Sequence, residues 1–141
     1  MKKMNKFTIL TQFIKDMSSE TKDVQTYLFV KEYISKYQLT IDINSKPTKN
    51  KLIEINTVLK FEDKEKNEKK SYFEMIYTSL VKVNEDIKEK KELEKIILCD
   101  VQNEIFPKVE KSFSDLLNNS GFTGVSFKKV DFNKLYMQRS N

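Results

Sequence analysis

The sequence of 141 residues contains no histidine and no tryptophan, and it has one cysteine, two glycines and two prolines. Without histidine, a catalytic triad, an imidazole general base and an imidazole metal site are all excluded within this chain. Gly121 and Gly124 are too few for the glycine-rich loops that cradle phosphates. The acidic residues lie mostly in lysine-rich runs, which are typical of solvated surfaces. We therefore predict a protein that is not an enzyme and that binds no metal or cofactor.

Long apolar runs are absent as well. No stretch approaches the roughly eighteen apolar residues that a membrane-spanning helix needs, and polar residues interrupt the apolar segment FTILTQFI near the N-terminus. The lone Cys99 cannot form an internal disulfide, which fits a reducing compartment. We therefore expect a cytoplasmic protein without stable membrane insertion. With 38% hydrophobic residues, the chain is predicted to form one domain, residues 1–141.

The charge balance is basic but evenly spread. The chain has 26 Lys and Arg against 21 Asp and Glu, which gives a net charge of +5 and a pI of about 9.1. No segment forms a basic block, and Arg139 is the only arginine, so the bidentate guanidinium contacts that read bases are almost unavailable. We expect no nucleic-acid partner, although a lysine-rich RNA-binding or structural adaptor stays as an alternative.

Alternation of apolar and polar residues predicts four strands, at residues 7–14, 38–44, 52–61 and 71–83. The first and the last strand carry apolar residues on both sides, which indicates that both of their faces are covered. The charge run EDKEKNEKK at 62–70 is expected to form a solvated hairpin loop. Residues 16–23 are polar and turn-like, whereas residues 24–37 fit a helix, a strand or an irregular packed segment.

Two helices follow the strands. The first begins at Asn84 or Asp86 and runs some thirty residues until Gly121 stops it, with a kink or break expected at Pro107. The second is short and begins after Asp131, whose carboxylate can cap its first turn. The fold class is therefore predicted as α+β: a four-stranded antiparallel sheet, one long helix kinked near Pro107 and one short C-terminal helix.

This architecture leaves part of the apolar surface of the sheet and the long helix uncovered. Two helices cannot cover both faces of the sheet, and a thirty-residue helix of about 45 Å is longer than a ten-residue strand of about 34 Å. Surplus apolar surface is buried either between copies of the chain or against apolar ligands. We therefore expect an oligomer, an apolar binding surface, or both.

Several spaced segments resemble the SecB family of bacterial export chaperones. They are Phe106-Pro107, Gly121-Phe122, the run VDFNKLYM at 130–137, the run IKDM at 14–17 with Glu20, and the run LTIDI at 39–43. The resemblance covers most of the chain. It implies a SecB-like fold, assembly as a homotetramer built from two dimers, and ATP-independent binding of unfolded polypeptides in apolar grooves.

The resemblance also implies two sets of site residues. Eight apolar residues match the client-binding groove: Leu39, Ile41, Ile43, Phe73, Met75, Phe132, Leu135 and Tyr136. Three acidic residues match the surface that docks on the export motor SecA: Asp16, Glu20 and Glu74. The family is usually strongly acidic, whereas this chain is basic and carries no acidic tail. A dedicated SecB-like chaperone for one client, such as an antitoxin, is therefore kept as an alternative.

Overall fold

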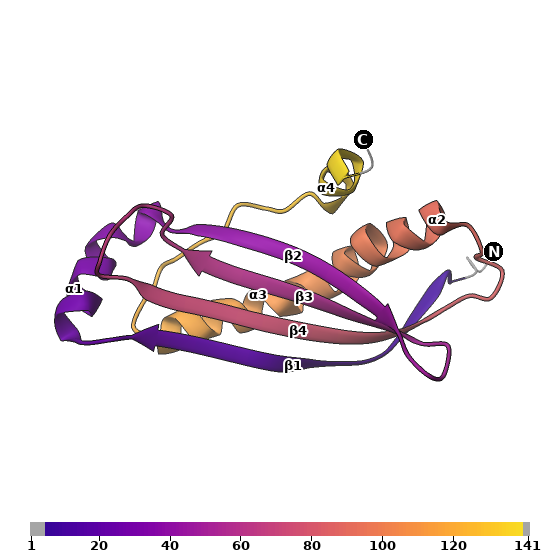
Figure 1. Cartoon of the computed structure of the whole chain (residues 1–141), viewed down its shortest axis with the longest axis horizontal. Helices are drawn as coiled ribbons and strands as arrows, with labels where there is room; N and C mark the ends of the chain where they lie inside the picture. The colour runs from indigo at the N-terminus through magenta and orange to yellow at the C-terminus, as the bar shows by residue number, and fades with distance from the viewer. Residues whose placement is uncertain (1–4, 140–141) are drawn as a thin grey trace.

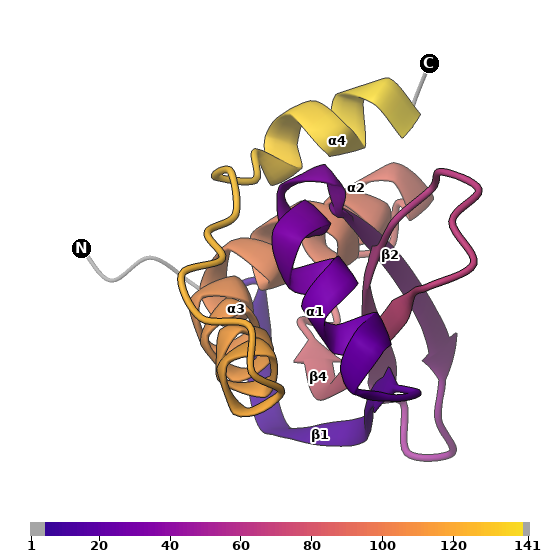
Figure 2. The same ribbon diagram turned by 90° about the vertical axis from the view of Figure 1, so that its left-hand side faces the viewer.

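The computed structural model describes residues 5–139. Its strands are β1 (Phe7–Thr21), β2 (Gln38–Pro47), β3 (Ile53–Glu62) and β4 (Ser71–Val83); its helical segments are α1 (Val24–Tyr33), the 3₁₀ turn η1 (Ile34–Lys36), α2 (Lys90–Lys95), the π-helical turn η2 (Ile96–Asp100), α3 (Val101–Asn119) and α4 (Phe132–Arg139). Figure 1 shows α3 lying along one face of the sheet, and Figure 2 shows α1 across one end of the molecule. The fold is thus the predicted α+β arrangement, with α1 added.

The sheet has the order β1-β4-β3-β2, and all of its neighbours are antiparallel, so β1 and β2 are its two edges. The strand expected at 71–83 is confirmed, and those expected at 38–44 and 52–61 are displaced at their ends by at most three residues. The turn expected at residues 16–23 is wrong, because β1 continues to Thr21. Two bulges, between Ile9 and Thr11 and between Ile14 and Asp16, keep β1 in register with the full length of β4.

The core lies between one face of the sheet and α3. Residues Ile55, Leu59, Met75 and Val81 of the strands and Ile105, Val109, Phe113 and Leu117 of α3 are buried there. The alternation predicted for β3 is confirmed, since Ile55, Thr57, Leu59 and Phe61 are all buried. The face of the sheet away from α3 is called the outer face below.

The cover expected on both sides of β1 is not supplied within one chain. Leu10, Phe13, Ile14 and Met17 are between 42% and 50% exposed. They lie on an edge strand, whose free backbone groups are a template for pairing with another strand. A single copy therefore leaves an apolar edge strand open to solvent.

The long helix begins later than predicted and is not broken where a break was expected. Asn84 accepts hydrogen bonds from the backbone N–H groups of Asp86 and Ile87, at 3.0 Å each, and this turn holds the segment outside the helix until Lys90. Pro107 lies inside α3, which continues to Asn119. Instead, the helical hydrogen bonding changes about two to three turns before Pro107, in η2.

The predicted stop at Gly121 is confirmed. The N–H of Phe122 donates to the carbonyl of Leu117 at 2.9 Å, and that of Gly121 donates to Asn118 at 3.1 Å, which together form a Schellman cap. Gly121 has φ +93°, and a Cβ placed there would lie 2.7 Å from the ring of Tyr27. Only glycine fits both requirements.

Residues 24–37, for which several structures were possible, form α1 and η1. The carboxylate of Asp23 accepts a 2.7 Å hydrogen bond from Thr26 N–H and so caps α1. Tyr27 packs against Phe122 with 5.1 Å between ring centroids, and its hydroxyl donates to the Gly121 carbonyl at 2.6 Å. Contacts with the end of α3 thus decide the helical form of this segment.

Candidate functional site

A groove runs beside the free edge of β2. Its larger hollow, of about 750 Å³, lies between β2 and the connection 123–130, and its smaller hollow, of about 260 Å³, lies between β2, η2 and α4. Ile41 lines both hollows, so they adjoin. We call the two together the β2 groove. Figure 1 shows the connection rising past the β2 edge toward α4.

The β2 edge that faces this groove has no strand partner. β2 pairs with β3 alone, and among residues 5–139 no backbone hydrogen bond joins it to the connection 123–130. On this side, the backbone N–H and C=O groups of β2 are therefore available to a further strand.

Aromatic side chains form the floor of the larger hollow. The ring of Phe61 lies 5.3 Å from that of Tyr37 and 5.5 Å from that of Phe127, which in turn contacts Phe113 of α3 at 5.9 Å. The Tyr37 hydroxyl donates to the carbonyl of Ser71 at 3.0 Å and accepts from its N–H at 2.9 Å. Burial raises the pKa of Tyr37, so the phenol stays protonated and fixed in place.

Helix α4 forms one wall of the smaller hollow; it is capped at its start and contacts η2 and α3. Asp131 caps its first turn by accepting a 3.0 Å hydrogen bond from Lys134 N–H, as predicted. Phe132 is buried, with its ring 5.0 Å from that of Phe106. The thiol of Cys99 donates to the side-chain oxygen of Asn133. Burial raises the pKa of this thiol, so it remains a protonated donor.

The structure places the eight predicted groove residues in two groups. Leu39, Ile41, Ile43 and Leu135 line the groove itself. The other four do not line it: Phe73, Met75 and Phe132 are buried, whereas Tyr136 is half-buried and donates its hydroxyl to the Lys91 carbonyl at 3.2 Å. The sequence pattern thus identified β2, the strand that borders the groove, but it did not distinguish the residues that line the groove from those buried in the core.

Sequence reasoning missed the connection between α3 and α4. Val125, Phe127, Lys128 and Lys129 line the larger hollow but were not predicted as site residues. The signal that identifies them is the alternation of Val125 and Phe127 around Ser126, which is typical of an extended segment with one buried side. The two lysines give no such signal, because lysines are common on every surface of this chain.

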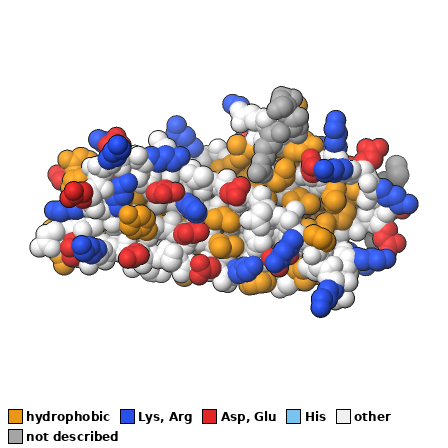
Figure 3. Space-filling view, viewed as in Figure 1, with side chains coloured by type: hydrophobic (Ala, Val, Ile, Leu, Met, Phe, Trp, Pro, Cys, Tyr) orange, Lys and Arg blue, Asp and Glu red, His pale blue; other side chains and the backbone are white. Residues whose placement is uncertain are grey.

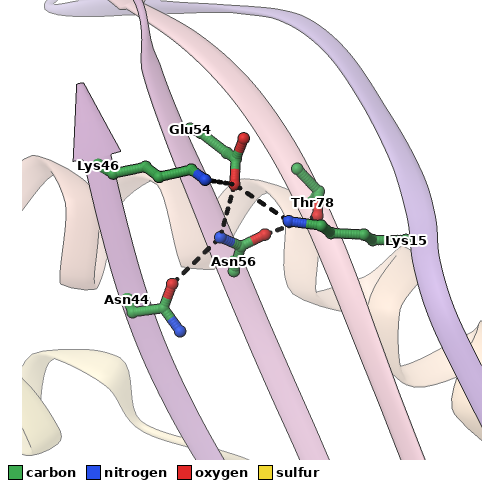
Figure 4. A network of polar contacts seen from close by, with 6 residues as sticks. All are labelled: Lys15, Asn44, Lys46, Glu54, Asn56 and Thr78. Atoms are coloured by element: carbon green, nitrogen blue, oxygen red, sulfur yellow. Dashed lines mark hydrogen bonds and ion pairs between the residues drawn. The ribbon is translucent and has the colours of Figure 1, made fainter. Parts of the chain in front are cut away.

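The outer face of the sheet carries a polar network that crosses all four strands (Figure 4). One carboxylate oxygen of Glu54 accepts from the Asn56 amide at 2.9 Å and lies 3.3 Å from Lys15 Nζ and 3.6 Å from Lys46 Nζ. Asn56 also bonds to Asn44 and Thr78. The Asn56 amide, followed by Lys15, lowers the pKa of Glu54. The network makes the middle of this face polar.

The three acidic residues predicted for motor docking lie together on this outer face. Asp16 and Glu20 are exposed and Glu74 is half-buried; Glu74 lies opposite Ser18, midway between Asp16 and Glu20 in the β1–β4 register. Alternate residues of a strand share a face, so all three carboxylates point the same way. Figure 3 shows the outer face with acidic, basic and apolar side chains interspersed.

Two kinds of feature are absent from residues 5–139. No cluster of three or more acidic or cysteine side chains is arranged to hold a metal ion in this part of the chain. None of its helices combines the length and the apolar character needed to cross a bilayer.

Comparison with known proteins finds one family. Residues 1–141 match the family described as preprotein translocase subunit SecB. A putative protein-export protein SecB of Pelagibacter ubique (strain HTCC1062) is 57% identical over 136 residues, covering 96% of this chain and 97% of that protein. The protein-export protein SecB of Bartonella quintana (strain Toulouse) is 24% identical over 133 residues, covering 94% and 83%.

A solved structure supports the same fold. A SecB-like chaperone of Mycobacterium tuberculosis, in complex with a peptide from the HigA1 antitoxin, has a TM-score of 0.59 at 9% identity, covering 89% of this chain and 91% of that one. At this identity the likeness establishes the fold alone, and it agrees with the α+β architecture predicted from the sequence.

Proposed function

The chain belongs to the SecB family of protein-export chaperones, which are not enzymes, and on that premise we propose that it holds non-native polypeptide in the β2 groove. The observation that carries the proposal is the unpaired edge of β2 beside two adjoining hollows. An extended client segment adds to this edge as a further strand, and its alternate side chains enter the apolar hollows. Backbone pairing suits a chaperone because it does not depend on the client sequence.

Of the three buried members of the predicted set, Phe132 alone takes part through movement of α4. A helix of eight residues is not stable alone, so α4 depends on its contacts with η2 and α3. When a bulky client displaces it, Phe132 leaves its site on Phe106 and becomes available to the client. Phe73 and Met75 support the floor from β4 and stay in the core.

We propose the β1 edge as the place where copies of the chain join. Four half-exposed apolar side chains on a strand with one free edge favour strand-to-strand association, which would give a dimer and, through the helices, a homotetramer. Measuring the mass in solution tests this assembly. A monomer at micromolar concentration would contradict it.

Docking on SecA is proposed through Asp16, Glu20 and Glu74, because the three carboxylates share one open face. Such a role places the protein in the cytoplasm, where precursors await export. Replacing all three by lysine is expected to weaken SecA binding, measured by surface plasmon resonance, because it reverses the local charge. Unchanged binding would remove these residues from the docking site.

The groove is tested by a pair of variants on one strand. Ile41→Asp puts a charge between the two hollows, whereas Thr40→Asp puts the same charge on the neighbouring outer-face residue. In titrations with a reduced, unfolded model protein, we expect Ile41→Asp to weaken binding by more than about tenfold, since a buried unpaired charge costs at least about 1.4 kcal/mol. Thr40→Asp is expected to change it little. Equal effects would show that clients bind elsewhere.

Two alternatives are separated by client range and salt. A dedicated chaperone, for example of an antitoxin such as the one whose peptide the fold neighbour holds, would bind one client tightly and unfolded model proteins hardly at all. A lysine-rich RNA adaptor would bind RNA in a manner that collapses with added salt. Broad client binding that survives moderate salt supports the groove.

A further inference from the structure

The charges around the β2 groove are unevenly distributed. Lys128 and Lys129 line the larger hollow, and among residues 5–139 no carboxylate lines it. Asp42 borders the smaller hollow, but it alternates with Ile41 and Ile43 along β2, so its side chain points to the outer face. The groove therefore has a basic end.

The two lysines are free to interact with a ligand. Within residues 5–139, neither Lys128 nor Lys129 forms an ion pair or a side-chain hydrogen bond, and both are exposed. Nearby Lys36, in contrast, already lies 3.9 Å from Glu65. Two adjacent unpaired ammonium groups beside an apolar hollow favour a partner that brings carboxylates with its apolar side chains.

We propose that the groove selects extended apolar segments that carry acidic residues at one flank, with those residues lying over Lys128 and Lys129. This inference rests on the proposed function of the groove and names the client chemistry that it prefers. The apolar part of the segment occupies the hollows. The lysine pair thus acts as a specificity determinant and is not required for binding as such.

Peptides with one apolar core and different flanks test the proposal. The flanks are two aspartates at the N-terminal or the C-terminal end, two lysines at the same ends, or two serines, and affinities are measured by isothermal titration calorimetry. At low salt we expect the better aspartate peptide to bind roughly 3- to 10-fold more tightly than its lysine counterpart, the range for one or two exposed ion pairs. The preference shrinks as salt rises.

Two charge-reversal variants locate the effect. Lys128→Glu with Lys129→Glu is expected to reverse the preference, with the serine-flanked peptide little changed. Lys88→Glu with Lys90→Glu is the matched control, because it changes the net charge equally at two exposed lysines that do not line the groove. This control is expected to keep the preference.

The outcomes distinguish the two proposals. If no peptide binds, the groove itself is not the client site. If all peptides bind equally, or if both variant pairs lose the preference alike, the groove stands and the lysine pair is not its specificity determinant. Reversal by the Lys128 and Lys129 changes alone supports the inference.

Discussion

Replacing Phe132 by alanine is the sharpest test of how α4 is held. The side chain packs edge-on against Phe106 at 5.0 Å, and among residues 132–138 of this short helix it alone is buried. Removing a buried phenylalanine ring costs about 3–5 kcal/mol where the site cannot collapse. A helix this short has little stability of its own to offset that loss. We therefore expect α4 to undock while the sheet and α3 stay folded.

Hydrogen exchange measures this undocking directly. A loss of about 3 kcal/mol corresponds to roughly a hundredfold faster exchange for amides protected by docking. We expect this acceleration at residues 133–138 and no comparable change in β3, β4 or α3. Met137→Ala, on the same helix but 60% exposed in the wild type, is the control and is expected to leave exchange nearly unchanged. Client binding is expected to weaken only in the Phe132 variant.

The reasoning would be refuted if exchange in β3, β4 and α3 rose as much as in α4. That result would mean that Phe132 belongs to the global core, and α4 could not move as a separate wall of the groove. Circular dichroism alone does not distinguish the two cases, because α4 contributes few residues to the helical signal.

Three further predictions concern stability. Gly121→Ala is expected to lower the free energy of unfolding by about 1–2 kcal/mol for the positive φ and by a further amount for the clash with the Tyr27 ring. Gly124→Ala is expected to cost only the part due to positive φ, since its Cβ would meet open space. Ser79→Ala is expected to be neutral or stabilising by up to about 1 kcal/mol, because the buried Ser79 hydroxyl has no hydrogen-bond partner among residues 5–139. Asp63→Asn is expected to make the free energy of unfolding fall less steeply as the pH is lowered into the acid range. Urea unfolding measures all three.

The sign of the Asp63 prediction follows from its contacts. Hydrogen bonds from the Asn67 side chain, at 2.7 Å, and from Glu65 N–H, at 2.9 Å, lower the pKa of Asp63 below its ordinary value of 3.8. The resulting stability is present above pH 3.8 and is lost as the pH falls through the lowered pKa. If the free energy of unfolding of Asp63→Asn falls with decreasing pH as steeply as that of the wild type, this explanation is contradicted. Equal costs at Gly121 and Gly124 would likewise contradict the role given to the Tyr27 ring.

Much of the fold could be predicted from local sequence patterns. The alternation in β3, the stop at Gly121 and the cap at Asp131 each depend on residues within a few positions of one another, so they were predictable and are confirmed. The strand form of the polar residues 16–21 was not predictable, because it depends on pairing with residues of β4 that lie fifty to sixty positions away. Tertiary hydrogen bonding outweighs weak local propensity in such a segment.

The sequence by itself excluded catalytic and metal sites built on histidine, showed which residues are apolar at strand and helix spacing, and indicated which family the chain resembles. Only the tertiary structure decided that β2 is a free edge and that the connection 123–130 brings Lys128 and Lys129 to its side. It also decided that Phe132 is buried while Leu135, three residues later, lines the groove. Strand order and burial are set by contacts between distant segments, and a local pattern is the same on a paired strand as on an open one.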